Sequence, residues 1–159
     1  YFYDGILTAG MVYQPTRKKY YYATLGKGAF VNGKPLKITY KPLKQCLLSG
    51  LISSRPEIYT NLFKTYQKIY PHVAGYRNLN SMAIDNCLLS ENAFSIVINA
   101  HTFIWDISAT KLIIEESGGI MIDFNGLPIN FDLNHPQLAY DVISCHPRLK
   151  SEILPFFNQ

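Results

Sequence analysis

Short apolar runs alternate along this chain with segments whose apolar residues recur at helical spacing. Several of the runs are rich in β-branched or aromatic residues, which favour strands. We therefore expect strands over residues 6–13, 20–24, 46–52, 72–76, 93–98, 120–123 and 140–144. The first two are separated by turn-forming residues 15–19, so they predict a β-hairpin.

Helical segments follow most of the later runs. A capping box with an early proline, Ser54-Arg55-Pro56-Glu57, predicts a helix that ends near Pro71. Further helices are expected over residues 81–90, 106–117 and 147–156. Because strands alternate with helices, the fold class is α/β, with a layered and largely buried sheet that carries helices on its faces.

The residue pattern of the chain changes after Pro42. Residues 1–42 carry the hairpin and glycine-rich turns, among them Asn32-Gly33, whereas residues 43–159 carry the strand and helix alternation. We therefore divide the chain into a β-hairpin region, 1–42, and an α/β domain, 43–159. The Gly26-x-Gly28 pair lacks a third glycine and precedes no helix, so a nucleotide-binding role is rejected.

A carboxylate marks the start of the helix predicted over residues 106–117. Asp106 follows Trp105, and aspartate is a preferred N-cap, so we expect Asp106 to open the helix. Ile107, Leu112, Ile113 and Ile114 give the helix a buried side, and Gly118 or Gly119 can end it. Helix starts also attract anions, so Asp106 can cap the helix, hold a divalent cation against a phosphate, or do both.

Composition limits the possible classes of protein. With 159 residues, 48% hydrophobic and 16% charged, the chain reads as a globular domain. No apolar run approaches the roughly 18 residues that would span a bilayer, and no leader sequence opens the chain, so we expect a cytoplasmic protein without a membrane partner. Cys46, Cys87 and Cys145 are widely spaced and are expected to be reduced core thiols.

The basic residues are concentrated early in the chain. No acidic residue occurs between Gly5 and Pro56, and the net charge is +4. The lysines sit at turns and are not massed on one helix, so solvation explains them better than nucleic-acid binding does, and we expect no nucleic-acid partner. The tyrosine-rich hairpin looks like an unpaired sheet edge, so self-association into a homo-oligomer is expected.

Two blocks of residues carry a resemblance to a known family. The first comprises Gly10-Met11-Val12-Tyr13-Gln14-Pro15 and the segment from Tyr22 to Gly33. The second comprises Trp105-Asp106 followed by Glu116-Ser117-Gly118-Gly119. In their order and spacing these blocks resemble the inositol monophosphatase family of magnesium-dependent, lithium-sensitive phosphatases.

The resemblance implies specific roles. Asp106 would bind Mg²⁺, and Asn80, Ser81 and Met82 match the family segment that contacts the substrate, with asparagine in place of the family's glycine. Asn99 stands where the family has a glutamate that contacts sugar hydroxyls. Ser53, at the end of a predicted strand, is a further candidate for binding the substrate. The substrate would be inositol phosphate, a related sugar phosphate or a nucleotide bisphosphate.

The family takes most of its metal ligands from an earlier glutamate and an Asp-Pro-x-Asp-Gly-Thr segment, which this chain does not contain. The resemblance therefore implies the C-terminal part of a phosphomonoesterase, in which residues 1–42 are left over from an N-terminal α+β metal-binding domain. We expect this part to be inactive alone. The alternative is a non-catalytic binding or dimerisation module derived from the family.

Overall fold

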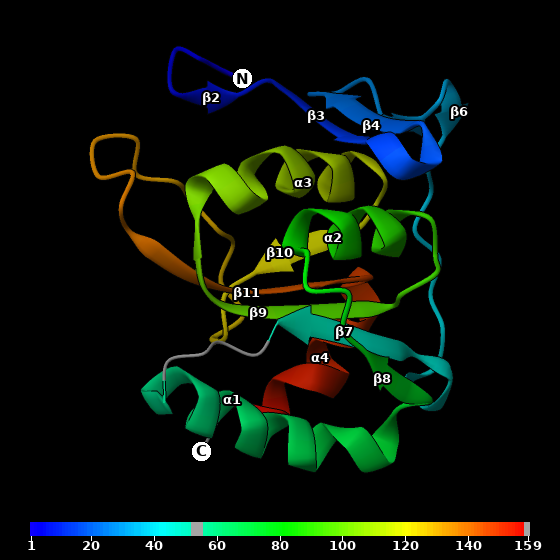
Figure 1. Cartoon of the computed structure of the whole chain (residues 1–159), viewed down its shortest axis with the longest axis vertical. Helices are drawn as coiled ribbons and strands as arrows, with labels where there is room; N and C mark the ends of the chain where they lie inside the picture. The colour runs from blue at the N-terminus through cyan, green and yellow to red at the C-terminus, as the bar shows by residue number, and fades with distance from the viewer. Residues whose placement is uncertain (52–55, 158–159) are drawn as a thin grey trace.

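The structure is a computed structural model that describes residues 1–51 and 56–157, except for the side chains of residues 51 and 56–59. Ser53 and the capping residues Ser54 and Arg55 lie outside the described residues. Within them, the chain forms two larger sheets and a small two-stranded one, with helices between and beside the larger sheets (Figure 1).

The first sheet is antiparallel, and its strand order is β3-β4-β5-β6. It contains β3 (Ala9–Gln14), β4 (Lys19–Thr24), β5 (Ala29–Val31) and β6 (Lys34–Pro35). A small hairpin of β1 (Phe2–Tyr3) and β2 (Ile6–Leu7) precedes it. The hairpin predicted from β3 and β4 is confirmed, but the strand expected over residues 6–13 is divided at Thr8 into β2 and β3.

The second sheet is mixed, with the strand order β10-β11-β9-β7-β8. Its strand β7 (Leu47–Leu51) is parallel to both β8 (Gly75–Arg77) and β9 (Ile96–Phe103). Strand β11 (Ala139–Cys145) is antiparallel to β9 and to β10 (Ile120–Ile122). The parallel strands therefore share one edge at which their carboxyl ends meet.

Four α-helices cover the sheets in the described part of the chain. Helices α2 (Met82–Ser90) and α3 (Ile104–Glu116) lie between the two sheets, while α1 (Pro56–Ile69) and α4 (Lys150–Ile153) lie on the other face of the second sheet (Figure 1). The layered α/β fold is thus confirmed, whereas the boundary at residue 42 stays a prediction. The single α-helix predicted over residues 147–156 is wrong, because only Lys150–Ile153 is α-helical and 3₁₀ turns (Pro147–Leu149 and Leu154–Phe156) flank it. Pro155, inside the predicted range, lacks the amide that a continuous helix would need.

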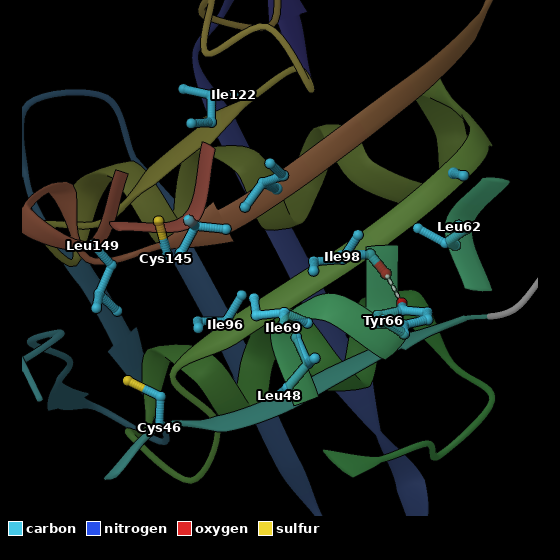
Figure 2. Packing of buried hydrophobic residues seen from close by; sticks show 13 residues of the cluster. Cys46, Leu48, Leu62, Tyr66, Ile69, Ile96, Ile98, Ile122, Cys145 and Leu149 are labelled. Carbon is cyan, nitrogen blue, oxygen red and sulfur yellow. Dashed lines mark hydrogen bonds between the residues drawn. The ribbon is translucent and has the colours of Figure 1, made fainter. Parts of the chain in front are cut away.

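The second sheet is buried on both faces. Toward α1 and α4 it packs Leu48, Ile96 and Ile98 against Ile69 and Leu149, and the Tyr66 hydroxyl donates a hydrogen bond of 3.1 Å to the Ile98 carbonyl (Figure 2). The opposite face contacts a second cluster that comprises Leu89, Val97, Ile107, Ile114 and Val142, among others. The predicted inward residues of α3 are all buried, which confirms the helical spacing read from the sequence.

The first sheet is held against α3 by residues from both blocks of the family resemblance. Gly10 lies so close to α3 that a Cβ atom there would stand 2.8 Å from the Ala109 carbonyl oxygen. At the end of α3, the Glu116 carboxylate accepts hydrogen bonds of 2.7 Å from the Gly26 and Gly28 amides. Both of these turn amides are therefore hydrogen-bonded to a side chain of the protein itself. After the helix, Gly118 adopts φ +88° and ends it.

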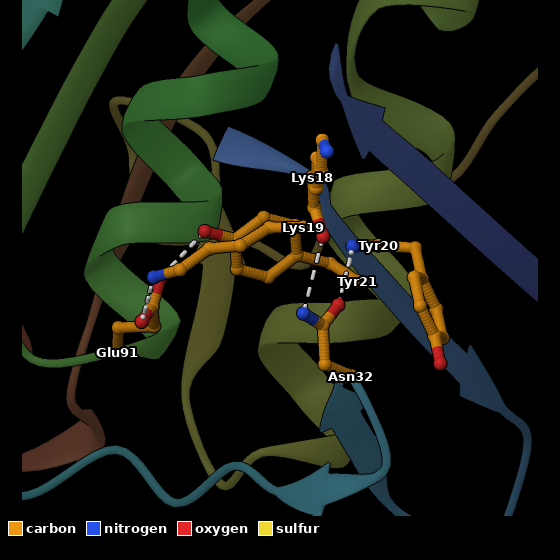
Figure 3. A network of polar contacts seen from close by, with 6 residues as sticks. All are labelled: Lys18, Lys19, Tyr20, Tyr21, Asn32 and Glu91. Carbon is orange, nitrogen blue, oxygen red and sulfur yellow. Dashed lines mark hydrogen bonds and ion pairs between the residues drawn. The ribbon is translucent and has the colours of Figure 1, made fainter. Parts of the chain in front are cut away.

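A polar cluster joins the first sheet to α2 (Figure 3). Glu91, which follows α2, accepts hydrogen bonds from the Lys19 ammonium at 2.6 and 2.8 Å and from the Tyr21 hydroxyl. Burial and the neighbouring Glu91 raise the pKa of Tyr21, so its hydroxyl stays a donor. Asn32, at φ +48°, accepts from the Tyr20 amide and donates to the Lys18 carbonyl, which confirms the Asn-Gly turn.

Two composition-based expectations concern the whole molecule. Cys46, Cys87 and Cys145 are buried and free, as predicted. Among the described residues, no helix combines the length and apolarity that a membrane crossing requires.

Candidate functional site

Asp106 stands in the first turn of α3, but it is not the N-cap. Strand β9 runs directly into the helix, so Phe103 takes the extended cap conformation at φ −115° and ψ 162°, and α3 begins at Ile104. The prediction that Asp106 opens the helix is therefore wrong by three positions. Its Oδ2 instead accepts a long hydrogen bond of 3.4 Å from the Phe103 amide. This half-buried carboxylate remains near the positive end of the helix dipole.

An aromatic group adjoins Asp106. The Trp105 ring stacks on Phe103 with centroids 4.8 Å apart, and Trp105 is 56% exposed. The His101 ring packs edge-on against the Phe103 ring, with centroids 5.4 Å apart. These side chains give the start of α3 an accessible apolar wall.

The segment Asn80-Ser81-Met82 forms the start of α2. Ser81 is the N-cap, and its Oγ accepts from the Ile84 amide at 3.5 Å. Asn80 adopts φ +57°, a conformation that glycine takes freely and that asparagine tolerates better than most residues. The replacement of the family's glycine by asparagine is therefore compatible with the same backbone turn.

The structure brings these two helix starts to one edge. Helix α2 follows β8 and α3 follows β9, so both begin at the carboxyl ends of the parallel strands. The helices contact each other, and the Asn86 amide donates to the Thr110 hydroxyl at 3.4 Å. Amide groups at such helix starts favour anions, and ligands of open α/β sheets usually bind at this edge.

The remaining candidates differ in their positions. Asn99 lies in β9 opposite Leu51 and Val142 and is fully buried, so its contact with a sugar hydroxyl stays a prediction. Met82 is half-buried at the first position of α2. Ser53 lies outside the described residues.

Sequence reasoning missed one ionisable residue next to this segment, Asp85. It is fully buried in α2, and neither of its carboxylate oxygens meets a hydrogen-bond partner among the described residues. Burial raises the pKa of Asp85. The signal was available, since Asp85 lies on one helical face with Met82 and Leu89.

The donor set at this edge does not by itself fit Mg²⁺. The described part of the chain contains no group of three or more His, Cys, Asp or Glu residues that could hold a metal ion. Asp106 supplies one carboxylate, whereas Mg²⁺ prefers near-octahedral coordination by oxygen. Asp106 and its described neighbours therefore do not complete a Mg²⁺ site by themselves.

A mixed sheet with two helix starts and a carboxylate at its parallel-strand edge defines an α/β protein suited to binding an anionic ligand there. A sequence model of one family assigns the chain more narrowly. It matches residues 1–157, and the chain belongs to the inositol monophosphatase family. This confirms the resemblance drawn from the two blocks of residues.

Individual relatives agree with the assignment. The chain is 31% identical to human inositol monophosphatase 1 over 147 residues, which cover 90% of this chain and 51% of that protein. It is 28% identical to Nus factor SuhB of Pasteurella multocida over 94% of this chain and 55% of that protein. The chain thus spans about half the length of the curated relatives it matches.

Solved structures share the fold. The SuhB protein of Bartonella henselae superposes with a TM-score of 0.84 at 20% identity, over 96% of this chain and 57% of that chain. The Thermotoga maritima IMPase gives a TM-score of 0.81 at 23% identity, over 95% and 56%. At these identities the likeness concerns the fold alone.

Proposed function

We propose that this chain supplies one half of a Mg²⁺-dependent phosphomonoesterase that hydrolyses inositol phosphate or a related sugar phosphate. Membership of a phosphatase family supports the reaction class. The observation that carries the proposal is the shared edge at which Ser81 caps α2 and Asp106 stands in the first turn of α3. Two sets of helix amides there can meet phosphoryl oxygens.

In this proposal the described residues bind and orient the substrate. Ser81 fixes the start of α2 through its bond to the Ile84 amide, and Asp106 offers a carboxylate at the start of α3. The other oxygen ligands for Mg²⁺ would come from the part of the relatives' length that this chain does not span. Asn99 would accept or donate a hydrogen bond where the family's glutamate only accepts.

The substrate class rests on comparison with other proteins. A structural neighbour, SaIMPase-II, is described with bound inositol monophosphate and also with bound 2′AMP. An inositol or sugar phosphate and a nucleoside monophosphate are therefore both substrates to test on this protein. The alternative substrate expected from the sequence, a nucleotide bisphosphate, is a third.

A second function is favoured by the names of some relatives. SuhB proteins of Pasteurella multocida and Neisseria meningitidis are called Nus factors, the latter putatively, rather than phosphatases. A non-catalytic binding or dimerisation module is consistent with the single carboxylate at the candidate site. Such a module would bind a partner without needing Mg²⁺.

The test is the substitution Asp106→Asn in the longest natural product of the gene, assayed on inositol 1-phosphate with and without Mg²⁺. The capping bond of Asp106 is long, so the variant should melt close to the parent temperature. It should nevertheless lose most activity or need much more Mg²⁺. Asp4→Asn, in an exposed turn, is the control.

The 159-residue chain alone should show negligible Mg²⁺-dependent activity, because one carboxylate cannot complete the metal site. Turnover by the Asp106→Asn variant equal to that of the parent, with unchanged Mg²⁺ dependence, would contradict the proposal. A full-length parent without any phosphatase activity would favour the binding module.

A further inference from the structure

A cavity lies on the face of the second sheet opposite α2 and α3. Its volume is about 720 Å³, within the range of small-molecule sites. It is enclosed by α1, by the ends of β9 and β11, and by the aromatic residues Phe124, Phe156 and Phe157. We call it the α1 pocket. His101, which lines it, also adjoins the candidate site through its ring contact with Phe103, whereas Ser81 and Asp106 do not line it.

One stripe of α1 forms the polar side of the α1 pocket. Asn61, Lys64, Thr65 and Lys68 recur at the three- and four-residue spacing that places side chains on one helical face. The core-facing side of α1 carries Leu62, Tyr66 and Ile69, which are buried. The two lysines, one turn apart, bring two positive charges to the same wall.

An irregularity in the sheet forms the end of the α1 pocket. The pairing of β9 with β11 shifts between Tyr140 and Val142, where two residues of β9, Ala100 and His101, bulge opposite the single residue Asp141. His101 opposite it adopts φ +54°, an uncommon conformation for a residue other than glycine. The Asp141 Oδ1 accepts a hydrogen bond of 2.8 Å from the His101 amide, so one oxygen of this carboxylate already has a donor.

The remaining wall is aromatic. The Phe124 and Phe157 rings lie 4.6 Å apart at 44°, and Phe156 contacts the His72 ring at 5.2 Å. The buried residues Leu62 and Ala100 also line the cavity. The α1 pocket thus combines an apolar surface with a rim that carries two lysines and one carboxylate.

From this combination we propose that the α1 pocket binds a small organic anion with an aromatic body, such as an aryl or nucleoside monophosphate. The ring would lie against the phenylalanines, and the phosphate would face Lys64 and Lys68. Lysine acts as a point charge toward phosphate and needs no fixed geometry. The proposal does not depend on the phosphatase reaction, because neither Ser81 nor Asp106 lines the α1 pocket.

The isolated chain is titrated with phenyl phosphate at low ionic strength, and binding is followed by backbone amide NMR shifts. The shifts should concentrate at Lys64, Phe124 and Phe157, which line the α1 pocket. The double variant Lys64→Gln, Lys68→Gln should weaken binding about tenfold or more, and added salt should do the same to the parent. Lys27→Gln, on an exposed turn, should leave binding unchanged.

Two further measurements separate the contributions of ring and charge. Benzyl alcohol and inorganic phosphate should each bind more weakly than phenyl phosphate. Asp141→Asn keeps an acceptor for the His101 amide but removes the negative charge, so it should tighten binding. Shifts centred on Ser81 and Asp106, an unweakened double lysine variant, or the absence of binding would each overturn the proposal.

Discussion

Replacing Glu116 by alanine tests how the two motif blocks are joined. The Glu116 carboxylate, at the last residue of α3, is the acceptor for both the Gly26 and Gly28 amides, each at 2.7 Å. A hydrogen bond to a charged group contributes about 1.5–3 kcal/mol net, and the bond to exposed Gly26 belongs at the low end. A negative charge at a helix C-terminus costs about 0.3–1 kcal/mol, which the substitution relieves.

The balance predicts that Glu116→Ala lowers the free energy of unfolding by about 2–4 kcal/mol. For a chain of this size each kcal/mol shifts Tm by about 2–4 °C. Glu116→Gln should not rescue the loss, because its amide nitrogen would face one of the two glycine N–H donors. Hydrogen exchange at Gly26 and Gly28 should accelerate in both variants.

The neighbouring carboxylate is the matched control. Glu115 pairs with Lys111 at 2.7 Å on the helix surface, an i,i+4 pair that contributes about 0.3–0.5 kcal/mol. Urea unfolding of Glu115→Ala and Glu116→Ala should therefore give clearly different midpoints. Equal midpoints would refute the view that Glu116 fastens the first sheet to α3.

Three further predictions concern buried positions. Burial raises the pKa of Asp85 above its ordinary 3.8, so the folded state holds the proton more tightly and stability falls as pH rises above that value. Asp85→Asn should gain stability over the parent at neutral pH, by about 1.4 kcal/mol per unit of pKa shift, and urea midpoints should converge at acid pH. Burial raises the pKa of Cys145 to about 12 and raises those of Cys46 and Cys87, so a thiol reagent at pH about 8 should label none of them before unfolding; labelling in native buffer would contradict this. Gly10→Ala should cost about 1–3 kcal/mol in urea unfolding, because its Cβ would press on the α3 backbone, and a neutral result would show that the first sheet can move away.

The sequence by itself determined the local elements and the chemistry of the motif residues. The spacing of Ile107, Leu112, Ile113 and Ile114 is a property of neighbouring residues, and it predicted a helix with one buried side that the structure confirms. The Asn32-Gly33 turn was equally local, because asparagine and glycine tolerate the left-handed backbone. The family blocks were readable for the same reason.

Only the tertiary structure decided how these elements meet. The start of α3 moved to Ile104 because β9 continues to Phe103, and that length depends on pairing with β11. Glu116 bonds to Gly26 and Gly28, about ninety residues away, a contact that no local pattern encodes. The burial of Asp85 and the α1 pocket likewise arise where separate segments pack, because burial and enclosure are properties of the packed assembly rather than of sequence spacing.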